Sequence, residues 1–270
     1  TTIGAEFGWR VAVMVTGVIS IVYGLIYYWR VRNTPKGSTY FKPKKTGALE
    51  VTSGFDLVLY MIMNIPMYAA LAMLAGKLAP GLISVETVNI IDGILAATYL
   101  FQVWKIWELN KHILKEPVPE LQRYSFTQVA ILDLAYMVTF GTELAVVSML
   151  PMFYVDMFGL DKVTAGMLAG SYAFINLVAR PMGGLISDKF GRKITLLIVF
   201  VGIGVSFMML GQVNQEWSVL MVIGAATLGG IFSKAGSGAV YAMVPLIQRR
   251  LTGQIAGMAG AFGNVGGVVF

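Results

Sequence analysis

The sequence predicts an all-α, polytopic membrane protein, and three observations support this fold class. Hydrophobic residues make up 57% of the 270-residue chain and charged residues 13%, whereas soluble domains carry about 25% charged residues. The mean hydropathy of the chain is +0.73. Apolar residues gather in about eight runs, and basic residues gather in the connections between these runs, as is typical of membrane-spanning helices.

Length and helix-breaking residues define each apolar run. A helix that crosses a bilayer needs about 20 apolar residues, and the complete runs approach or exceed this length. Asn64 and Pro66 interrupt the second run, and Pro117 and Pro119 prevent the third from continuing. The expected helices cover residues 9–29, 55–79, 88–109, 127–152, 164–186, 194–210 and 217–247, and an eighth begins near residue 251 and is truncated.

The basic residues between the runs predict the orientation of the chain. They follow the first, third, fifth and seventh runs. After the first run they are Arg30, Arg32, Lys36, Lys42, Lys44 and Lys45. The connections after the second, fourth and sixth runs hold only Lys77, only Lys162 and no basic residue. Because Lys and Arg are retained on the cytoplasmic side, we expect a protein integral to the lipid bilayer of the plasma (inner) membrane, with its basic loops in the cytoplasm.

Composition also excludes several classes of function. The chain has no cysteine and a single histidine, His112, in a basic segment, so we expect no disulfide, no metal centre and no cofactor. The formal net charge of +6 resides in loops, which argues against a nucleic-acid partner. Paired carboxylates, histidine clusters and Ser/Lys dyads, which intramembrane catalysis would need, are missing, so we do not expect an enzyme.

Four charged residues remain well inside the apolar runs. They are Asp133, Glu143, Arg180 and Lys234. A charge at that depth costs at least a few kcal/mol, so each should face protein or water and find a partner. In the fourth run, helical spacing places Asp133, Tyr136, Phe140 and Glu143 on one stripe. In the fifth run, Asn176 lies one turn from Arg180 and could simply orient it.

The depth of these residues predicts two layers. At a rise of 1.5 Å per residue, Arg180 and Tyr136 each lie roughly 12 Å from the cytoplasmic ends of their helices. Glu143 and Lys234 lie deeper, about 20 Å from that side. The acid and the amine could therefore neutralise each other as a structural ion pair, or they could form part of a proton relay.

Arg180 has the chemistry of a site for a small anion. Its planar guanidinium can donate two parallel hydrogen bonds to an oxyanion and stays charged at any working pH. Two other interpretations are that Arg180 extends to the cytoplasmic loop or pairs with a carboxylate. Glycines share one face of the eighth run, which either lets an anion approach peptide N–H groups or allows close helix packing. Tyr136 and Phe140 could equally be packing residues.

The connection between the fifth and sixth runs contains a short motif of glycine and charged residues: Gly184, Asp188, Lys189, Gly191, Arg192 and Lys193. Gly184 would allow close helix contact, Asp188 could cap the next helix or pair with a base, and Gly191 would turn the chain. The motif resembles the cytoplasmic signature of the major facilitator superfamily. The resemblance implies that the motif gates the inward face and does not bind substrate.

Further stretches are similar to the nitrate/nitrite porters of that superfamily. The glycine-rich segment 257–267 resembles their glycine signature, segment 179–184 resembles their substrate-arginine helix, and segments 140–144 and 241–245 resemble other helix motifs. The resemblance implies an alternating-access carrier that holds nitrate or nitrite between two halves. The implied substrate-binding residues are Arg180, Tyr136, Asn176, Gly260, Gly263, Asn264 and Gly267. Glu143 and Lys234 are the candidates for coupling.

The resemblance also implies a domain organisation. Residues 1–31 would form the last helix of an N-terminal half, residues 32–126 a cytoplasmic linker, and residues 127–270 a truncated C-terminal half. The linker would contain an inserted pair of apolar helices, 55–79 and 88–109, which we expect to pack as an accessory hairpin at the periphery. The missing N-terminal half of the same chain would supply a second arginine and a sister glycine signature.

Two questions about function stay open from the sequence. Transport could be proton symport, with Glu143 as the titrating group, or nitrate/nitrite exchange, which needs no titrating group. The alternatives to nitrate transport are a carrier for another small anion and a non-transporting membrane sensor or scaffold.

Overall fold

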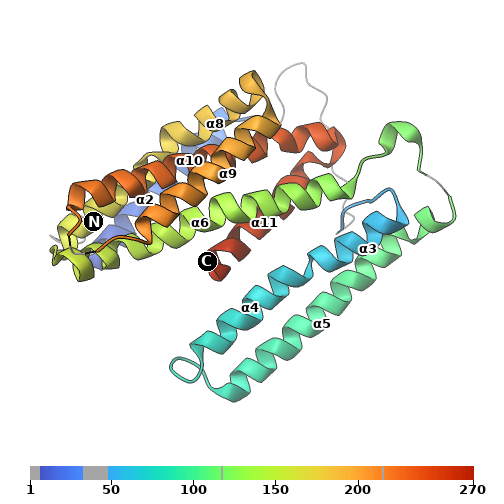
Figure 1. Ribbon diagram of the computed structural model, residues 1–270. Helices are drawn as coiled ribbons and strands as arrows, with labels where there is room; N and C mark the ends of the chain where they lie inside the picture. Colours follow the sequence, from blue (N-terminus) through green and yellow to red (C-terminus); the bar gives the residue numbers. More distant parts are fainter. Residues whose placement is uncertain (1–6, 33–47, 117, 215) are drawn as a thin grey trace. The chain divides into compact units, whose positions relative to one another are not determined.

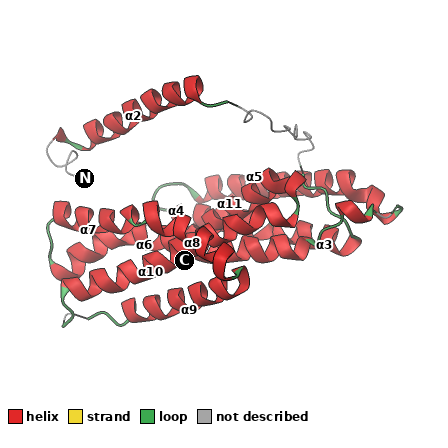
Figure 2. Ribbon diagram, turned by 90° about the horizontal axis from the view of Figure 1, so that it is seen from above, coloured by secondary structure: helices red, strands yellow, loops and turns green. Residues whose placement is uncertain are grey.

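The computed structural model describes residues 7–32, 48–116, 118–214 and 216–270, and all regular secondary structure in these ranges is helical (Figures 1 and 2). The basic residues Lys36, Lys42, Lys44 and Lys45 lie outside the described ranges. The α-helices are α2 (Trp9–Arg30), α3 (Gly54–Met63), α4 (Ile65–Leu78), α5 (Val85–Asn110), α6 (Phe126–Phe158), α7 (Lys162–Phe174), α8 (Asn176–Phe190), α9 (Arg192–Leu210), α10 (Val219–Ile247) and α11 (Thr252–Val269). Short 3₁₀ turns cover Lys111–Leu114, Glu120–Gln122 and Arg249–Leu251.

The predicted all-α, polytopic class is confirmed. Five helical segments among the described residues are long and apolar enough to cross a membrane, judged by length and composition. They are Arg10–Arg30, Gly54–Leu78, Phe126–Phe158, Arg192–Leu210 and Val219–Ile247. The remaining expected spans correspond to α5, to the pair α7 and α8, and to α11.

The chain divides into two compact units, each described here by itself. The first combines Thr1–Lys44 with Met149–Ser171, and so contains α2, the end of α6 and most of α7. The second combines Lys45–Ser148 with Tyr172–Phe270 and contains every residue of the candidate site described below.

Helix α10 packs along both α8 and α9, and both views show these helices side by side (Figures 1 and 2). Glycine makes the crossing with α8 possible. A Cβ atom at Gly183 would overlap the main chain of Ala235, and one at Gly238 would overlap the carbonyl group of Arg180. Only residues without a side chain allow two helix backbones to approach this closely.

Helix α6 contacts α10 on one side and α11 on another, again through glycine. A Cβ atom at Gly236 would lie 2.5 Å from Thr139 Cγ2, and one at Gly141 would lie 2.5 Å from Gly266 Cα. The glycine-rich face of α11 is therefore a packing surface for α6 at this point. These contacts hold α6, which carries most of the candidate site, between α10 and α11.

The expected span 55–79 consists of two helices, α3 and α4, which meet at Asn64, where the sequence predicted an interruption. Asn64 Nδ2 donates a hydrogen bond to the carbonyl of Tyr60 (2.7 Å), and its Oδ1 accepts one from Gln102 Nε2 (2.8 Å). The buried amide thus satisfies polar groups at the interruption, and Pro66 is tolerated in the first turn of α4. Helix α5 runs from 85 to 110 instead of 88 to 109, because Ser84 caps it by accepting from the backbone N–H of Thr87 (3.2 Å).

The hairpin α3–α4–α5 is anchored where α6 and α11 begin. Asp56 Oδ1 accepts a hydrogen bond from the backbone N–H of Phe126, the first residue of α6 (3.1 Å). Arg250 Nη2 donates to Glu50 Oε2 (2.7 Å), which connects the segment before α3 with the start of α11. Buried residues of the hairpin also share one hydrophobic cluster with α6, α10 and α11.

Two predicted helix boundaries were wrong. Helix α6 passes through Pro151 and ends at Phe158, not at 152. A backbone in an apolar surrounding must satisfy its own hydrogen bonds, so a helix continues where the loss is a single N–H. The expected helix 164–186 is α7 and α8, which are separated at Ile175. Its carbonyl accepts from the N–H of Val178 (3.1 Å), a tighter turn of 3₁₀ type.

Candidate functional site

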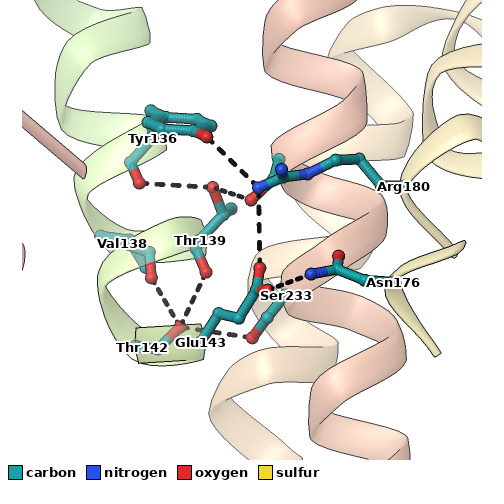
Figure 3. A network of polar contacts seen from close by, with 9 residues as sticks. Tyr136, Val138, Thr139, Thr142, Glu143, Asn176, Arg180 and Ser233 are labelled. Carbon is teal, nitrogen blue, oxygen red and sulfur yellow. Dashed lines mark hydrogen bonds and ion pairs between the residues drawn. The ribbon is translucent and has the colours of Figure 1, made fainter. Parts of the chain in front are cut away.

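Arg180 projects from α8 toward α6, where its guanidinium contacts Tyr136 and Glu143 (Figure 3). Nη2 donates a hydrogen bond to the hydroxyl of Tyr136 (3.3 Å) and lies 3.7 Å from Glu143 Oε2. The central guanidinium carbon lies 5.3 Å from the ring centroid of Phe140. Of the three interpretations of this arginine, pairing with a carboxylate is the one found in the structure, and Tyr136 shares its layer as the depth estimate predicted.

Aromatic rings surround the guanidinium on one side. Tyr136 stacks on Phe140 with ring centroids 5.1 Å apart and planes at 10°, and it meets Tyr241 edge to face at 4.9 Å. Gly263 of α11 lies against both stacked rings, since a Cβ atom there would be 2.6 Å from Tyr136 Cε1 and 2.7 Å from Phe140 Cδ1. Gly263 therefore sets the position of the Tyr136 ring, whose hydroxyl accepts the hydrogen bond from Arg180.

The other predicted residues of the glycine face have different neighbours. A Cβ atom at Gly267 would lie 2.9 Å from Leu144 Cδ1, and one at Gly260 would lie 3.4 Å from the hydroxyl of Tyr241. Asn264 is exposed, and its Nδ2 donates to the carbonyl of Gly260 within α11 (3.0 Å). The face thus contacts α6 and Tyr241, and only Gly263 touches a residue bonded to Arg180.

Glu143 is the counter-charge of Arg180, not of Lys234. Its carboxylate is buried on α6, and Oε1 accepts a hydrogen bond from Asn176 Nδ2 (2.5 Å). Asn176 therefore holds the carboxylate instead of orienting the arginine directly. The expected ion pair between Glu143 and Lys234 is absent among the described residues, because α8 presents both Asn176 and Arg180 to the acid.

Lys234 is fully buried on α10 and lies against an aromatic ring. Its Nζ is 3.5 Å from the ring centroid of Tyr172, a cation–π contact. Within the described ranges, neither Lys234 Nζ nor the Tyr172 hydroxyl has a hydrogen-bond partner. Tyr172 in turn packs on Gly230, where a Cβ atom would lie 2.6 Å from its ring.

Sequence reasoning missed a row of hydroxyl groups between α6 and α10. Thr142 Oγ1 lies 3.3 Å from Ser233 Oγ, and Ser237 Oγ donates to Thr139 Oγ1 (3.3 Å). The two threonines are three residues apart on α6, near Glu143, and the two serines are four residues apart on α10, near Lys234. Their signal was the position of small polar residues on an otherwise apolar helix face.

The loop between α8 and α9 has the local structure that its motif indicated. Asp188 Oδ1 accepts a hydrogen bond from Arg192 Nη2 (2.9 Å), so the acid pairs with a base instead of capping α9. Gly191 has a φ of 99°, a backbone conformation that favours glycine. Lys189 and Lys193 are exposed. The close contact with α10 falls mainly on Gly183, whereas a Cβ atom at Gly184 would lie 3.5 Å from the carbonyl oxygen of Gly238, an ordinary van der Waals distance.

No described group of three or more His, Cys, Asp or Glu side chains could hold a metal ion. The site is accordingly one of a guanidinium, a carboxylate, an amide and phenol groups. Its unusual feature is a positive charge inside an apolar helix bundle that is partly balanced by a single acid.

The family model of the Major Facilitator Superfamily matches residues 1–270. The chain therefore belongs to the Major Facilitator Superfamily and is an integral membrane protein. Membership of this superfamily of carriers agrees with the prediction that the protein is not an enzyme.

Individual proteins of known name are also similar to this chain. The chain is 45% identical over 273 residues to the "Nitrate/nitrite transporter NrtP" of Nostoc punctiforme, which covers 99% of this chain and 55% of that protein. It is 44% identical over 278 residues to the protein of the same name from Picosynechococcus, covering 98% of this chain and 51% of that protein. It is 32% identical over 169 residues to the "High affinity nitrate transporter 2.7" of Arabidopsis thaliana, covering 56% of this chain and 34% of that protein.

The coverage percentages show how much of each relative the chain matches. The chain spans about half the length of the first two relatives, and their matches include the region of the inserted hairpin. No solved structure matches the chain significantly. The predicted family resemblance to nitrate/nitrite porters is confirmed.

Proposed function

We propose that this chain forms part of a carrier that moves nitrate and nitrite across the membrane by alternating access, with Arg180 as an anion-binding residue. The observation that carries the proposal is the contact of the half-buried Arg180 guanidinium with Tyr136, Phe140 and the buried Glu143. A planar guanidinium suits a planar oxyanion, because it offers parallel N–H donors and a permanent charge. The names of the relatives supply the identity of the anion.

Binding has a consequence for Glu143. The carboxylate already acts as the counter-ion of Arg180, so an arriving anion competes with it for the same guanidinium. Either Glu143 takes up a proton, which would couple transport to protons, or it leaves Arg180 while still charged, which suits exchange of one anion for another. Both mechanisms are compatible with the proposal.

We also propose a domain organisation and a membrane orientation for the chain. Residues 1–31 would end an N-terminal half, residues 127–270 would begin the C-terminal half, and the anchored hairpin would belong to the intervening 32–126. The partner half would carry a second arginine. The basic loops would face the cytoplasm from the plasma membrane, since they follow alternate helices.

The test of the proposal is Arg180→Lys in the complete transporter that carries this chain. Loss of one charge-assisted hydrogen bond removes about 1.5–3 kcal/mol, or roughly a 10- to 150-fold loss of affinity. Nitrate binding would be measured by calorimetry and uptake with labelled nitrate in proteoliposomes. Arg249→Lys, a substitution of the same kind outside the site, is the matched control. Unchanged nitrate affinity in Arg180→Lys would contradict the proposal.

Two further measurements separate the alternatives. Competition of labelled nitrate uptake by nitrite, chlorate and formate identifies the preferred anion, and weak competition by nitrite together with strong competition by another anion would identify a different carrier. Binding without flux in proteoliposomes would instead indicate a sensor or scaffold.

A further inference from the structure

Three charged side chains lie close together in the core of the second unit, and they do not balance. Arg180 and Lys234 contribute two positive charges and Glu143 one negative charge, which leaves a net charge of +1. Glu143 pairs with Arg180, whereas no described carboxylate pairs with Lys234. A buried ammonium group without a counter-ion is costly, and such groups in membrane proteins usually serve a functional purpose.

The geometry places Glu143 between the two cations. Tyr172, Asn176 and Arg180 follow one another at four-residue intervals. The first step crosses the interruption at Ile175, and the second, within α8, is about 6 Å of helix rise. Tyr172 covers Lys234, Asn176 holds Glu143, and Arg180 pairs with Glu143. The Glu143 carboxylate therefore lies level with Asn176, between Lys234 at the Tyr172 end of this row and Arg180 at the other end.

The contact between α6 and α10 brings the acid and the lysine to the same place. Thr142 Oγ1 and Ser233 Oγ are 3.3 Å apart, and each directly precedes one of the two charged residues in the sequence. The Lys234 ammonium group faces the ring of Tyr172, while Asp133 lies ten residues from Glu143 along α6, about 15 Å away.

We propose that Lys234 is the second partner of Glu143, which the carboxylate joins when a substrate anion takes its place on Arg180. This inference rests on the proposed function. The cluster with its net charge of +1 then becomes neutral with one nitrate or nitrite bound, and Glu143 stays paired without taking up a proton. Lys234 would act as a positioning residue for the exchange of anions and would not itself contact the substrate.

A double-mutant cycle tests the inference in the complete transporter. Nitrate affinity is measured for the wild type, Lys234→Met, Glu143→Gln and the double variant, with Lys234→Gln as a second neutral substitution. Without Lys234 the carboxylate has no alternative to Arg180, so we expect affinity to fall by about tenfold or more, within the range typical of coupled sites. In the Glu143→Gln background there is no carboxylate to displace, so the same substitution should have little effect.

The outcomes are distinct. Rescue of affinity in the double variant, with an unchanged or higher melting temperature for Lys234→Met, supports the proposal, because removal of an unpaired buried charge should not destabilise the resting protein. An equal loss of affinity in both backgrounds would mean that Lys234 acts on the anion directly, and no loss in either would mean that it has no part in binding. A lower melting temperature without rescue would indicate a structural role. Each of these last three results overturns the proposal, while a wild type that binds no nitrate overturns the proposed function instead.

Discussion

Glu143 stands where an anion bound to Arg180 would stand: its Oε2 lies 3.7 Å from Nη2 of the guanidinium. Asn176 holds the other carboxylate oxygen from α8, the same helix that carries the arginine. In the proposed site, Arg180 is thus paired with an internal anion, and binding of a substrate anion to Arg180 would require this contact to break.

Glu143→Gln should retain exchange of external labelled nitrate for internal nitrite in proteoliposomes. The amide preserves the hydrogen bond with Asn176 in shape but carries no charge to compete for Arg180. Uptake would be compared with and without a proton gradient. Gradient-driven uptake in the wild type that disappears in Glu143→Gln would identify Glu143 as a proton carrier and contradict this expectation.

Tyr136→Phe should weaken nitrate binding moderately while leaving the fold intact. The substitution removes the hydroxyl that accepts from Arg180 at 3.3 Å but keeps the ring stacked on Phe140. Loss of one neutral hydrogen-bond partner is worth about 0.5–1.5 kcal/mol, or roughly 2- to 13-fold in dissociation constant. Calorimetry would measure the change, with Tyr28→Phe on the exposed surface of α2 as the control. An affinity equal to that of the wild type would show that the hydroxyl does not position the guanidinium.

Gly263→Ala should reduce nitrate affinity by displacing Tyr136. The added Cβ atom would lie 2.6 Å from the Tyr136 ring, whereas at Gly253 of the same helix there is no atom within 4 Å of this position. Overpacking of this kind costs about 1–3 kcal/mol. Both alanine variants would be compared by nitrate binding and thermal melting. The prediction fails if Gly263→Ala and Gly253→Ala behave alike.

Gly183→Ala should destabilise the second unit more than any other single methyl addition in α8. Its Cβ atom would overlap the main chain of Ala235, and backbone cannot move aside as a flexible side chain can. We expect a loss of about 1–3 kcal/mol, seen as a lower melting temperature in detergent. Gly204→Ala in α9 meets no atom within 4 Å and is the matched control. Equal melting temperatures for the two variants would refute the close crossing of α8 and α10.

Asn110→Ala should loosen the inserted hairpin. This buried amide accepts from the N–H of Val51 (2.9 Å) and donates to the carbonyls of Leu49 (3.1 Å) and Ile106 (2.9 Å). Leaving such buried groups unpaired costs about 1–3 kcal/mol. Limited proteolysis of the segment before α3 should accelerate, compared with Asn89→Ala on the exposed face of the same helix. Unaltered cleavage would mean that the hairpin is held by other contacts.

Helical periodicity predicted much of this protein because the hydrocarbon surroundings leave few alternatives to a helix. The positions of the apolar runs gave the helices to within a few residues, except where Pro151 was passed and where the helix was interrupted at Ile175. The rise per residue was enough to place Tyr136 and Arg180 at the same depth. The positive φ of Gly191 likewise follows from a glycine in a short charged loop.

Which charge pairs with which was decided by the tertiary structure. Spacing along one helix shows which residues share a face, but an ion pair joins two helices, and its partners depend on where those helices cross and how each is rotated. Here the glycine crossing of α8 on α10 and the hydroxyl contacts of α6 with α10 direct Glu143 to Arg180 and leave Lys234 against Tyr172. The sequence alone therefore determined a membrane helix bundle with two acids and two cations inside its apolar runs, whereas only the packing of the helices decided that Glu143 pairs with Arg180.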